Sequence, residues 1–255
     1  MPRDRRSRAR LVAPLLALAL LAVSCAGGGR LLKKQYEYEE ELYLSLDGSA
    51  TLNVNASVAA LVALHGVDLP VDPRARLDRE KVRLLYATPG VEPIVSLSRR
   101  DGRRFVHVSI DVPDVRSLAR IAPLAWSTYR FGREGESVEY RQVVGPPTGH
   151  PVEHVGWTGG EVIAFRMHVP SKIEFHNSPS GTIERGNILE WEQPLSARLA
   201  GEPIELRVQM QPQSILAQTL LLFGSMILAA LLALAVVVWW VARSGKEPDA
   251  VRPQS

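Results

Sequence analysis

Hydrophobic and polar positions divide this chain into three parts. Two apolar runs, residues 11–23 and 215–241, contain 13 and 27 residues without a charged side chain. Between them, short stretches alternate apolar with polar residues, which is the period of a half-buried β-strand. The pattern predicts one folded domain, residues 35–213, with a hydrophobic segment on either side.

The first predicted hairpin begins the domain. Apolar residues occupy alternate positions in residues 36–46 and again in 50–56, on either side of Asp47-Gly48. A two-residue turn would put the two apolar faces on opposite sides of the sheet. We therefore expect a three-residue loop or a bulge that pairs Leu44 with Leu52.

A second hairpin is predicted around Asp101-Gly102, a dipeptide that favours a two-residue type I′ turn. This turn pairs Val95 with Val108 and keeps the apolar residues of both strands on one face. Alternation predicts further strands at 128–131, 137–144, 162–169, 187–193 and 203–210.

Three short helices fit between the strands, because each has a capping side chain before it. Ser57, Asp78 and Asp114 precede the predicted helices 58–65, 79–87 and 115–122. Hairpins with a few helices predict an α+β fold with an antiparallel sheet covered on one face.

The N-terminal segment has the three regions of a secretory signal peptide, residues 1–24. Five arginines and one aspartate precede the apolar run, which is too short to span a bilayer. The single cysteine, Cys25, follows it in a sequence that resembles the lipobox of bacterial lipoproteins. Cys25 is then the lipid attachment site at the start of a leash, residues 25–34; the alternative is an incidental cysteine.

Residues 215–241 are long enough to form a transmembrane helix, and they end in two tryptophans suited to the interface. Arg243 and Lys246 follow the tryptophans. The positive-inside rule therefore places residues 242–255 in the cytoplasm and the domain outside. We expect the inner (plasma) membrane of a bacterium.

The formal net charge of +3 does not indicate a nucleic-acid partner. Residues 26–214 carry 22 basic and 24 acidic side chains, so the excess positive charge lies outside the domain. Nucleic-acid binding is therefore disfavoured.

Two local clusters suggest chemistry. His150, Glu153 and His154 match a zinc-peptidase pattern, but Pro151 disfavours the helix that this chemistry needs, so a polar loop is the better interpretation. Four arginines surround the second hairpin's turn and form a positive tip, which either contacts lipid head groups or is simply solvated. These arginines are Arg99, Arg100, Arg103 and Arg104.

Two groups of aromatic residues have similar alternatives. Tyr36 and Tyr38, among four glutamates, fit alternating exposure on a first strand better than an acidic binding ribbon. Six later aromatic residues either fill the core or line a cavity, and the core is the commoner role. They are Trp126, Tyr129, Phe131, Tyr140, Trp157 and Trp191. No motif for catalysis, a metal or a cofactor is present, so we expect a non-enzymatic protein.

The order of features resembles the LppM-type lipoproteins. The likeness rests on Cys25, a hairpin after it, the segments 114–120, 165–170 and 187–191, and a C-terminal span with a basic tail. It implies a small α+β ectodomain that binds membrane lipids or glycolipids, with no catalytic residues. The alternative is a structural or scaffolding subunit that binds an envelope protein partner. A third possibility, an envelope hydrolase, would need a cleft with converging titratable groups, and no motif in the sequence indicates one.

Overall fold

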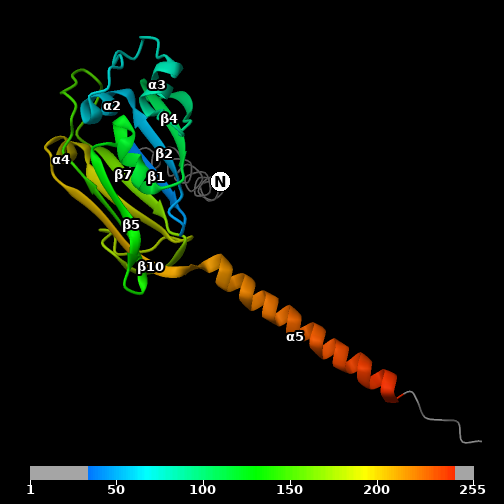
Figure 1. The fold of residues 1–255 in the computed structure, drawn as a ribbon. Coiled ribbons are helices and arrows are strands. Elements are labelled where there is room, and N and C mark those ends of the chain that lie inside the picture. Colours follow the sequence, from blue (N-terminus) through cyan, green and yellow to red (C-terminus); the bar gives the residue numbers. More distant parts are fainter. Residues whose placement is uncertain (1–33, 245–255) are drawn as a thin grey trace, which may run out of the picture.

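The structure is a computed structural model of the chain. It describes residues 34–244, with side chains for residues 34–213 and 219–243. Ten strands form two sheets that pack face to face, and a long helix leaves one end of the domain (Figure 1). The α+β class predicted from the sequence is confirmed.

The larger sheet has six strands in the order β3-β4-β2-β1-β7-β9, and the smaller has four in the order β5-β6-β10-β8. The strands are β1 (Gln35–Leu44), β2 (Ala50–Ser57), β3 (Ile94–Arg100), β4 (Arg103–Val112), β5 (Ser127–Glu134), β6 (Ser137–Val144), β7 (Glu161–His168), β8 (Ser171–His176), β9 (Ile188–Pro194) and β10 (Ile204–Ser214). The pair β1–β7 is parallel, and all other pairs are antiparallel. The prediction of an antiparallel sheet missed this pair, because its strands are far apart in the sequence.

The helices are short except for the last. They are α2 (Val58–His65), α3 (Arg79–Tyr86), the 3₁₀ turns η1 (Val115–Arg120) and η2 (Ala122–Leu124), α4 (Leu195–Leu199) and α5 (Ile215–Ser244). Ser57, Asp78 and Asp114 cap their helices as predicted, each accepting a hydrogen bond from a backbone N–H. The helix predicted over 115–122 is instead two 3₁₀ segments, and Pro123, which was expected beyond its end, lies within the first residues of the second segment, where a proline is tolerated.

The two predicted hairpins had different outcomes. Val95 pairs with Val108, and Asp101 has the positive φ of a type I′ turn, so the second hairpin is confirmed. In the first hairpin the predicted pairing of Leu44 with Leu52 is wrong, because Leu44 pairs with Ala50. The turn is centred one residue earlier than predicted, on Asp47, as the Ser45 N–H that donates to the Ser49 carbonyl at 2.9 Å shows.

A strand that was not predicted, β8, joins the edge of the smaller sheet. Only Val169 and Pro170 separate it from β7, so the chain changes sheet within two residues. Its first residue, Ser171, pairs with Ser214, the last residue of β10. The predicted strand 203–210 thus extends to Ser214 and meets α5 without a linker.

Side chains from both sheets fill the space between them. Trp126, Tyr129, Tyr140 and Trp191 are all buried, which confirms the core interpretation for these four. Phe131 and Trp157 are partly buried against the same core.

Helix α2 is buried throughout residues 58–64 and is covered by the loop that follows β6. The Thr148 N–H donates to the Leu64 carbonyl at 2.9 Å. A Cβ atom on Gly149 would lie 2.2 Å from the Val62 carbonyl oxygen, so only glycine fits this close approach.

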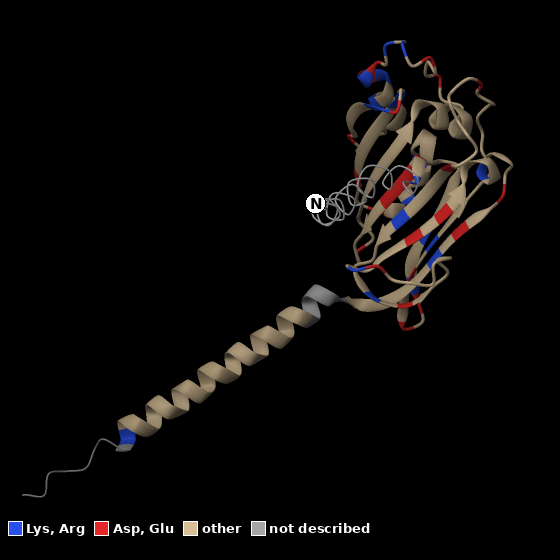
Figure 2. Ribbon diagram, turned by 180° about the vertical axis from the view of Figure 1, so that it is seen from behind, with Lys and Arg blue, Asp and Glu red and all other residues tan. Residues whose placement is uncertain are grey.

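Residues Thr219–Arg243 of α5 are exposed in the structure, and this part of the helix is long and apolar enough to cross a membrane. Figure 2 shows no acidic or basic residue along the described part of α5 before the blue segment at its end, where Arg243 lies. An apolar surface of this extent is unfavourable in water.

Candidate ligand-binding site

A surface pocket of about 320 Å³ lies between edge strand β3 and the segment that leads into α3. Its lining residues are Ala75, Arg76, Leu77, Leu97, Ser98, Arg99 and Arg104. Three guanidinium groups and the apolar side chains of Ala75, Leu77 and Leu97 therefore surround one space, and no acidic residue lines it. Figure 1 places α3 at the end of the domain opposite α5.

Arg104 forms part of the wall of this pocket. It lies on β4 and is only 6% exposed. Its Nη1 donates to the Ala75 carbonyl at 2.7 Å, and its Nη2 donates to the Pro70 carbonyl. The side chain thus holds the segment before α3 against the sheet. Burial lowers the pKa of Arg104, and the nearby Arg99 cation lowers it further.

Arg76 and Arg99 are the exposed cations of the pocket. Neither forms an ion pair with another residue in the described part of the chain. Their charges are therefore available to an anion, whereas the donors of Arg104 are already used in part.

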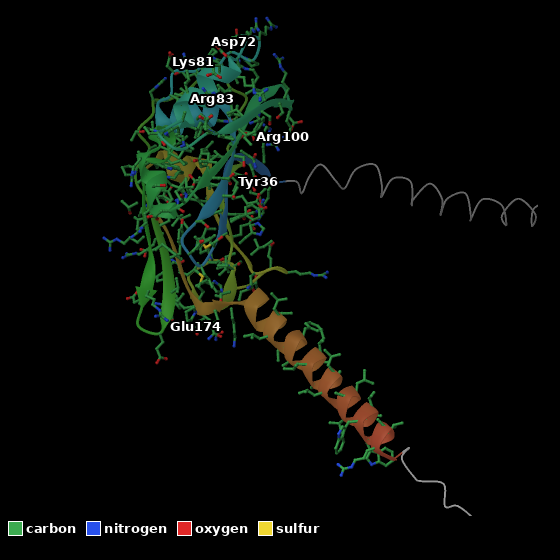
Figure 3. All side chains as sticks on the ribbon, turned by 45° about the vertical axis from the view of Figure 1, so that its right-hand side comes forward. Tyr36, Asp72, Lys81, Arg83, Arg100 and Glu174 are labelled. Atoms are coloured by element: carbon green, nitrogen blue, oxygen red, sulfur yellow. The ribbon has the colours of Figure 1, made fainter. Side chains whose placement is uncertain are left out.

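The four arginines of the second hairpin do not form the compact positive tip that was predicted. Arg103 turns toward β1, where its Nη1 donates to Glu37 Oε1 at 2.5 Å, and Arg104 is buried. Arg100 donates to the Tyr36 carbonyl at 2.8 Å and lies 4.2 Å from the centre of the Phe105 ring. Figure 3 shows Arg100 and Tyr36 on the same side of the domain. Of the four, Arg99 is the exposed arginine that lines the pocket.

The prediction of simple alternating exposure along β1 is wrong at two glutamates, Glu37 and Glu40, which are both buried. Glu37 lies at a register shift between Tyr36 and Tyr38 in the pairing of β1 with β7. Glu37 lies beneath Trp157, whose Nε1 donates to Glu37 Oε2 at 3.1 Å. The loop after β6 thus covers this end of the strand.

Glu40 lies between the two sheets. Tyr38 donates its hydroxyl to Glu40 Oε1 at 2.6 Å, and Gln142 Nε2 donates to Oε2 at 3.1 Å. Burial raises the pKa of Glu40, although these two hydrogen bonds oppose the shift. The space beside it is about 10 Å³, which is room for one water molecule rather than a ligand.

A second depression, of about 410 Å³, lies over β5 and β6. Arg141 and Arg207 line it, but Glu205 and Glu139 neutralise them through contacts of 2.7 Å each. Arg130 and Arg133 also line it, together with the carboxylates of Glu134 and Glu139. Because acidic side chains lie in this lining, it is a weaker candidate for an anionic ligand than the pocket beside β3.

The zinc-peptidase pattern falls in an irregular loop, as its proline indicated. His154 has a φ of 58°, and both it and Glu153 are highly exposed. No group of three potential metal ligands occurs in the part of the chain that the structure describes. Cys25 and the predicted signal peptide lie outside the described residues.

Sequence reasoning found Arg99 and Arg104 but missed Arg76 and Leu77. Nothing in the local sequence connects residues 75–77 with β3, because the pocket exists only when the segment before α3 folds against the sheet. The arginines that line a pocket and those that support a hairpin look identical in a sequence.

Fold and site together define a small α+β domain, fused to a helix able to span a membrane, with a cationic surface pocket. No family model matches the chain, and no curated protein matches it. Among solved structures, it is similar to the folded domain of the LppM protein of Mycobacterium tuberculosis, determined by NMR. That match has 12% sequence identity and a TM-score of 0.39, and it covers 72% of this chain and 95% of that chain. A likeness this distant carries no argument about function.

Proposed function

We propose that this chain is a membrane-anchored envelope protein whose domain binds a lipid or lipid-like ligand that carries a negative charge. The observation that supports it is the pocket of about 320 Å³, lined by three arginines and by apolar side chains, without an acidic residue.

Size and chemistry agree with this class of ligand. Small-molecule sites have volumes of about 300–1,000 Å³ and combine apolar walls with a few polar groups. Guanidinium groups bind phosphate and carboxylate through paired hydrogen bonds. Leu77 and Leu97 supply apolar surface beside these cations, so an anionic head group with part of an alkyl chain fits better than a free inorganic ion.

The proposed location follows from the anchors. Helix α5 is the proposed span, with the domain outside and the C-terminal residues in the cytoplasm of a bacterium. Cys25, where it is lipidated, provides a second anchor at the other end of the domain. Both anchors keep the domain beside a membrane that supplies lipids, and the proposed role needs no cofactor.

Binding of octyl phosphate to the full chain in amphipol tests the proposal, with isothermal titration calorimetry as the measurement. Octyl glucoside is the matched uncharged ligand. We expect octyl phosphate to bind, octyl glucoside to bind at least about 10-fold more weakly, and Arg99→Gln with Arg76→Gln to remove the difference. Inorganic phosphate shows whether the alkyl chain contributes.

Arg133→Gln is the control variant, because Arg133 lines the other depression. Equal binding of octyl phosphate by the wild type and by the Arg76/Arg99 double variant would contradict the proposal. That outcome would favour the rival role as a scaffolding subunit, for which edge strand β3 offers Ile94, a side chain that is 69% exposed.

A further inference from the structure

The chain between α2 and α3 contains a strap, residues 70–77, whose last three residues line the pocket. None of its side chains is buried, although Leu69 before it is only 6% exposed. Figure 3 places Asp72, within the strap, at the end of the domain that carries Lys81 and Arg83 of α3. A segment that buries so little apolar surface gains little stability from packing, so it is among the parts of a fold that open most easily.

A single side chain, Arg104 of β4, holds the strap to the sheet by hydrogen bonds. Its guanidinium group donates to the Ala75 carbonyl at 2.7 Å and to the Pro70 carbonyl. The other hydrogen bonds of the strap are local, such as the one from the Arg74 N–H to Asp72 Oδ1 at 2.9 Å. In the part of the chain that the structure describes, no further hydrogen bond or ion pair joins the strap to the sheet.

Arg104 also faces a like charge on the neighbouring strand. Arg99 is its direct partner in the pairing of β3 with β4, and both residues line the pocket. Like charges directly opposite each other destabilise a sheet. Among the described residues neither arginine has an ion-pair partner, and the Asp72 carboxylate acts on Arg104 only at longer range. The sheet therefore carries two cations without a neutralising partner at the point where it holds the strap.

An anionic head group in the pocket changes both features. Arg76 comes from the strap and Arg99 from β3, so an anion that binds both guanidinium groups joins the strap to the sheet. Its charge also offsets the repulsion between Arg99 and Arg104. The contact with Arg76 exists only while the strap is docked, and a ligand shifts an equilibrium toward the state that it binds more tightly. Binding therefore favours the docked strap.

We propose that the strap is a gate of the pocket that Arg104 positions and that a bound anionic lipid fastens against β3. This inference rests on the proposed lipid-binding function. Without ligand, the strap detaches transiently and opens the pocket to an incoming lipid. With ligand, Arg76 and Arg99 close on the head group. Arg104 is a positioning residue, because its bonds to the strap carbonyls set the distance between the two walls of the pocket.

Limited digestion with trypsin, on the full chain in amphipol, tests the gate. Arg74 is exposed and does not line the pocket, so cleavage after it reports detachment of the strap. Arg185 is the control site, since its exposed turn lies beside the start of α5: Asn187 donates to the Ser171 carbonyl, and Ser171 pairs with Ser214.

We expect saturating octyl phosphate to slow cleavage after Arg74 by about 10-fold or more, because ligand and protease compete for docked and open forms. Octyl glucoside should leave this rate unchanged, and cleavage after Arg185 should respond to neither compound. Mass spectrometry identifies the fragments. Equal cleavage after Arg74 with and without octyl phosphate, at concentrations where calorimetry shows binding, would overturn the gate.

Arg104→Met tests the positioning role. The variant lacks both hydrogen bonds to the strap, so cleavage after Arg74 should be fast and independent of octyl phosphate. Arg104→Lys keeps the charge and a donor group, and it should restore part of the ligand dependence. Wild-type cleavage after Arg185 shows that each variant is folded. Ligand protection of wild-type size in a folded Arg104→Met variant would contradict the role of Arg104.

Pro70→Gly gives an independent test that leaves the side chain of Arg104 intact. Glycine retains the carbonyl that accepts from Arg104 but adds backbone freedom to the detached strap. Cleavage after Arg74 without ligand should therefore become about 2- to 5-fold faster, with protection by octyl phosphate retained. An unchanged rate would mean that cleavage does not depend on detachment of the strap, which contradicts the gate.

The gate and the proposed function fail in different ways. Calorimetric binding of octyl phosphate without protection of Arg74 rejects the gate and retains the lipid-binding domain. Absence of binding in the calorimeter rejects the proposed function, and the ligand-fastened gate with it.

Discussion

At the scale of single residues, close packing limits what the chain can tolerate. The loop after β6 crosses the C-terminal end of α2, where a Cβ on Gly149 would approach the Val62 and Ala63 carbonyl oxygens to 2.2 and 2.3 Å. These are backbone atoms in a buried helix, so they cannot move aside as a flexible side chain does.

Gly149→Ala should therefore lower the free energy of unfolding by about 1–3 kcal/mol, which is the usual cost of overpacking. Gly160→Ala is the control, because the nearest atom to its added Cβ is 4.0 Å away. Urea unfolding of both variants, followed by tryptophan fluorescence, measures the difference. Equal stabilities would mean that the loop does not pack on α2 in solution.

The buried Glu40 predicts how the stability of the fold depends on pH. Its pKa is raised in the folded state by burial, so folding favours the protonated form. The unfolded chain loses this proton near its ordinary value of 4.5 while the folded chain still holds it. The contribution of Glu40 to stability is thus fully present below pH 4.5 and is lost as pH rises toward the folded pKa.

Glu40→Gln keeps a neutral group in place and should remove this loss. Urea unfolding between pH 5 and 8 should show the wild type losing stability relative to the variant as pH rises. His65 acts in the opposite direction, because burial lowers its pKa to about 3, but it is present in both proteins and cancels. A constant difference across this range would show that Glu40 is ionised in the fold.

At the scale of elements, the shape of the pocket depends on α3 and on the segment before it, Ala75–Leu77, which forms one side of the pocket. Only Val82 and Tyr86 of this helix are buried, so tertiary packing holds it less strongly than it holds α2. Its N-terminus depends on Asp78, which accepts a hydrogen bond from the Glu80 N–H at 2.9 Å.

Asp78→Ala should cost about 1 kcal/mol of stability through loss of this cap. It should also weaken octyl phosphate binding. The pocket residues Ala75–Leu77 directly precede Asp78, so loosening the start of α3 also loosens this wall of the pocket. Asp78→Asn is the matched variant, since asparagine caps as well as aspartate. Hydrogen exchange of the α3 amides measures the effect. If both variants protect these amides equally, the cap is not what holds α3.

At the scale of the whole molecule, the domain and the proposed span are directly joined. Strand β10 continues into α5 without an intervening residue. In Figure 3, Glu174 marks the end of the domain nearest to α5, whereas Asp72 and Arg83 mark the end that carries α3. With α5 in a bilayer, the pocket then lies at the far end of the domain. We therefore expect it to accept single lipid molecules rather than to rest on that bilayer.

The expected orientation can be tested with reporters fused after residue 255. A cytoplasmic C-terminus predicts a fluorescent GFP fusion and an inactive alkaline phosphatase fusion. The reverse result would place the domain in the cytoplasm and contradict the proposal of a lipid-binding domain outside the membrane.

Lipidation is a separate prediction from the sequence. Cys25→Ala should abolish incorporation of an alkyne-labelled palmitate, because the thiol is the expected attachment site. Persistent labelling in this variant would show that Cys25 is not the acylated residue.

The sequence alone determined much of the local structure. Alternation and the Asp101-Gly102 turn gave the second hairpin its register, and a side chain before each helix marked its start. The 27-residue apolar run predicted the long C-terminal helix. These features depend on residues close together in the chain, so local rules suffice.

Tertiary structure decided what long-range pairing controls. The parallel contact of β1 with β7 and the burial of Glu40 against Gln142 join segments more than 100 residues apart. The inward turn of Arg103 and Arg104 and the formation of the pocket arise from the same cause. A side chain's chemistry is set by its neighbours in space, and here those neighbours come from other strands.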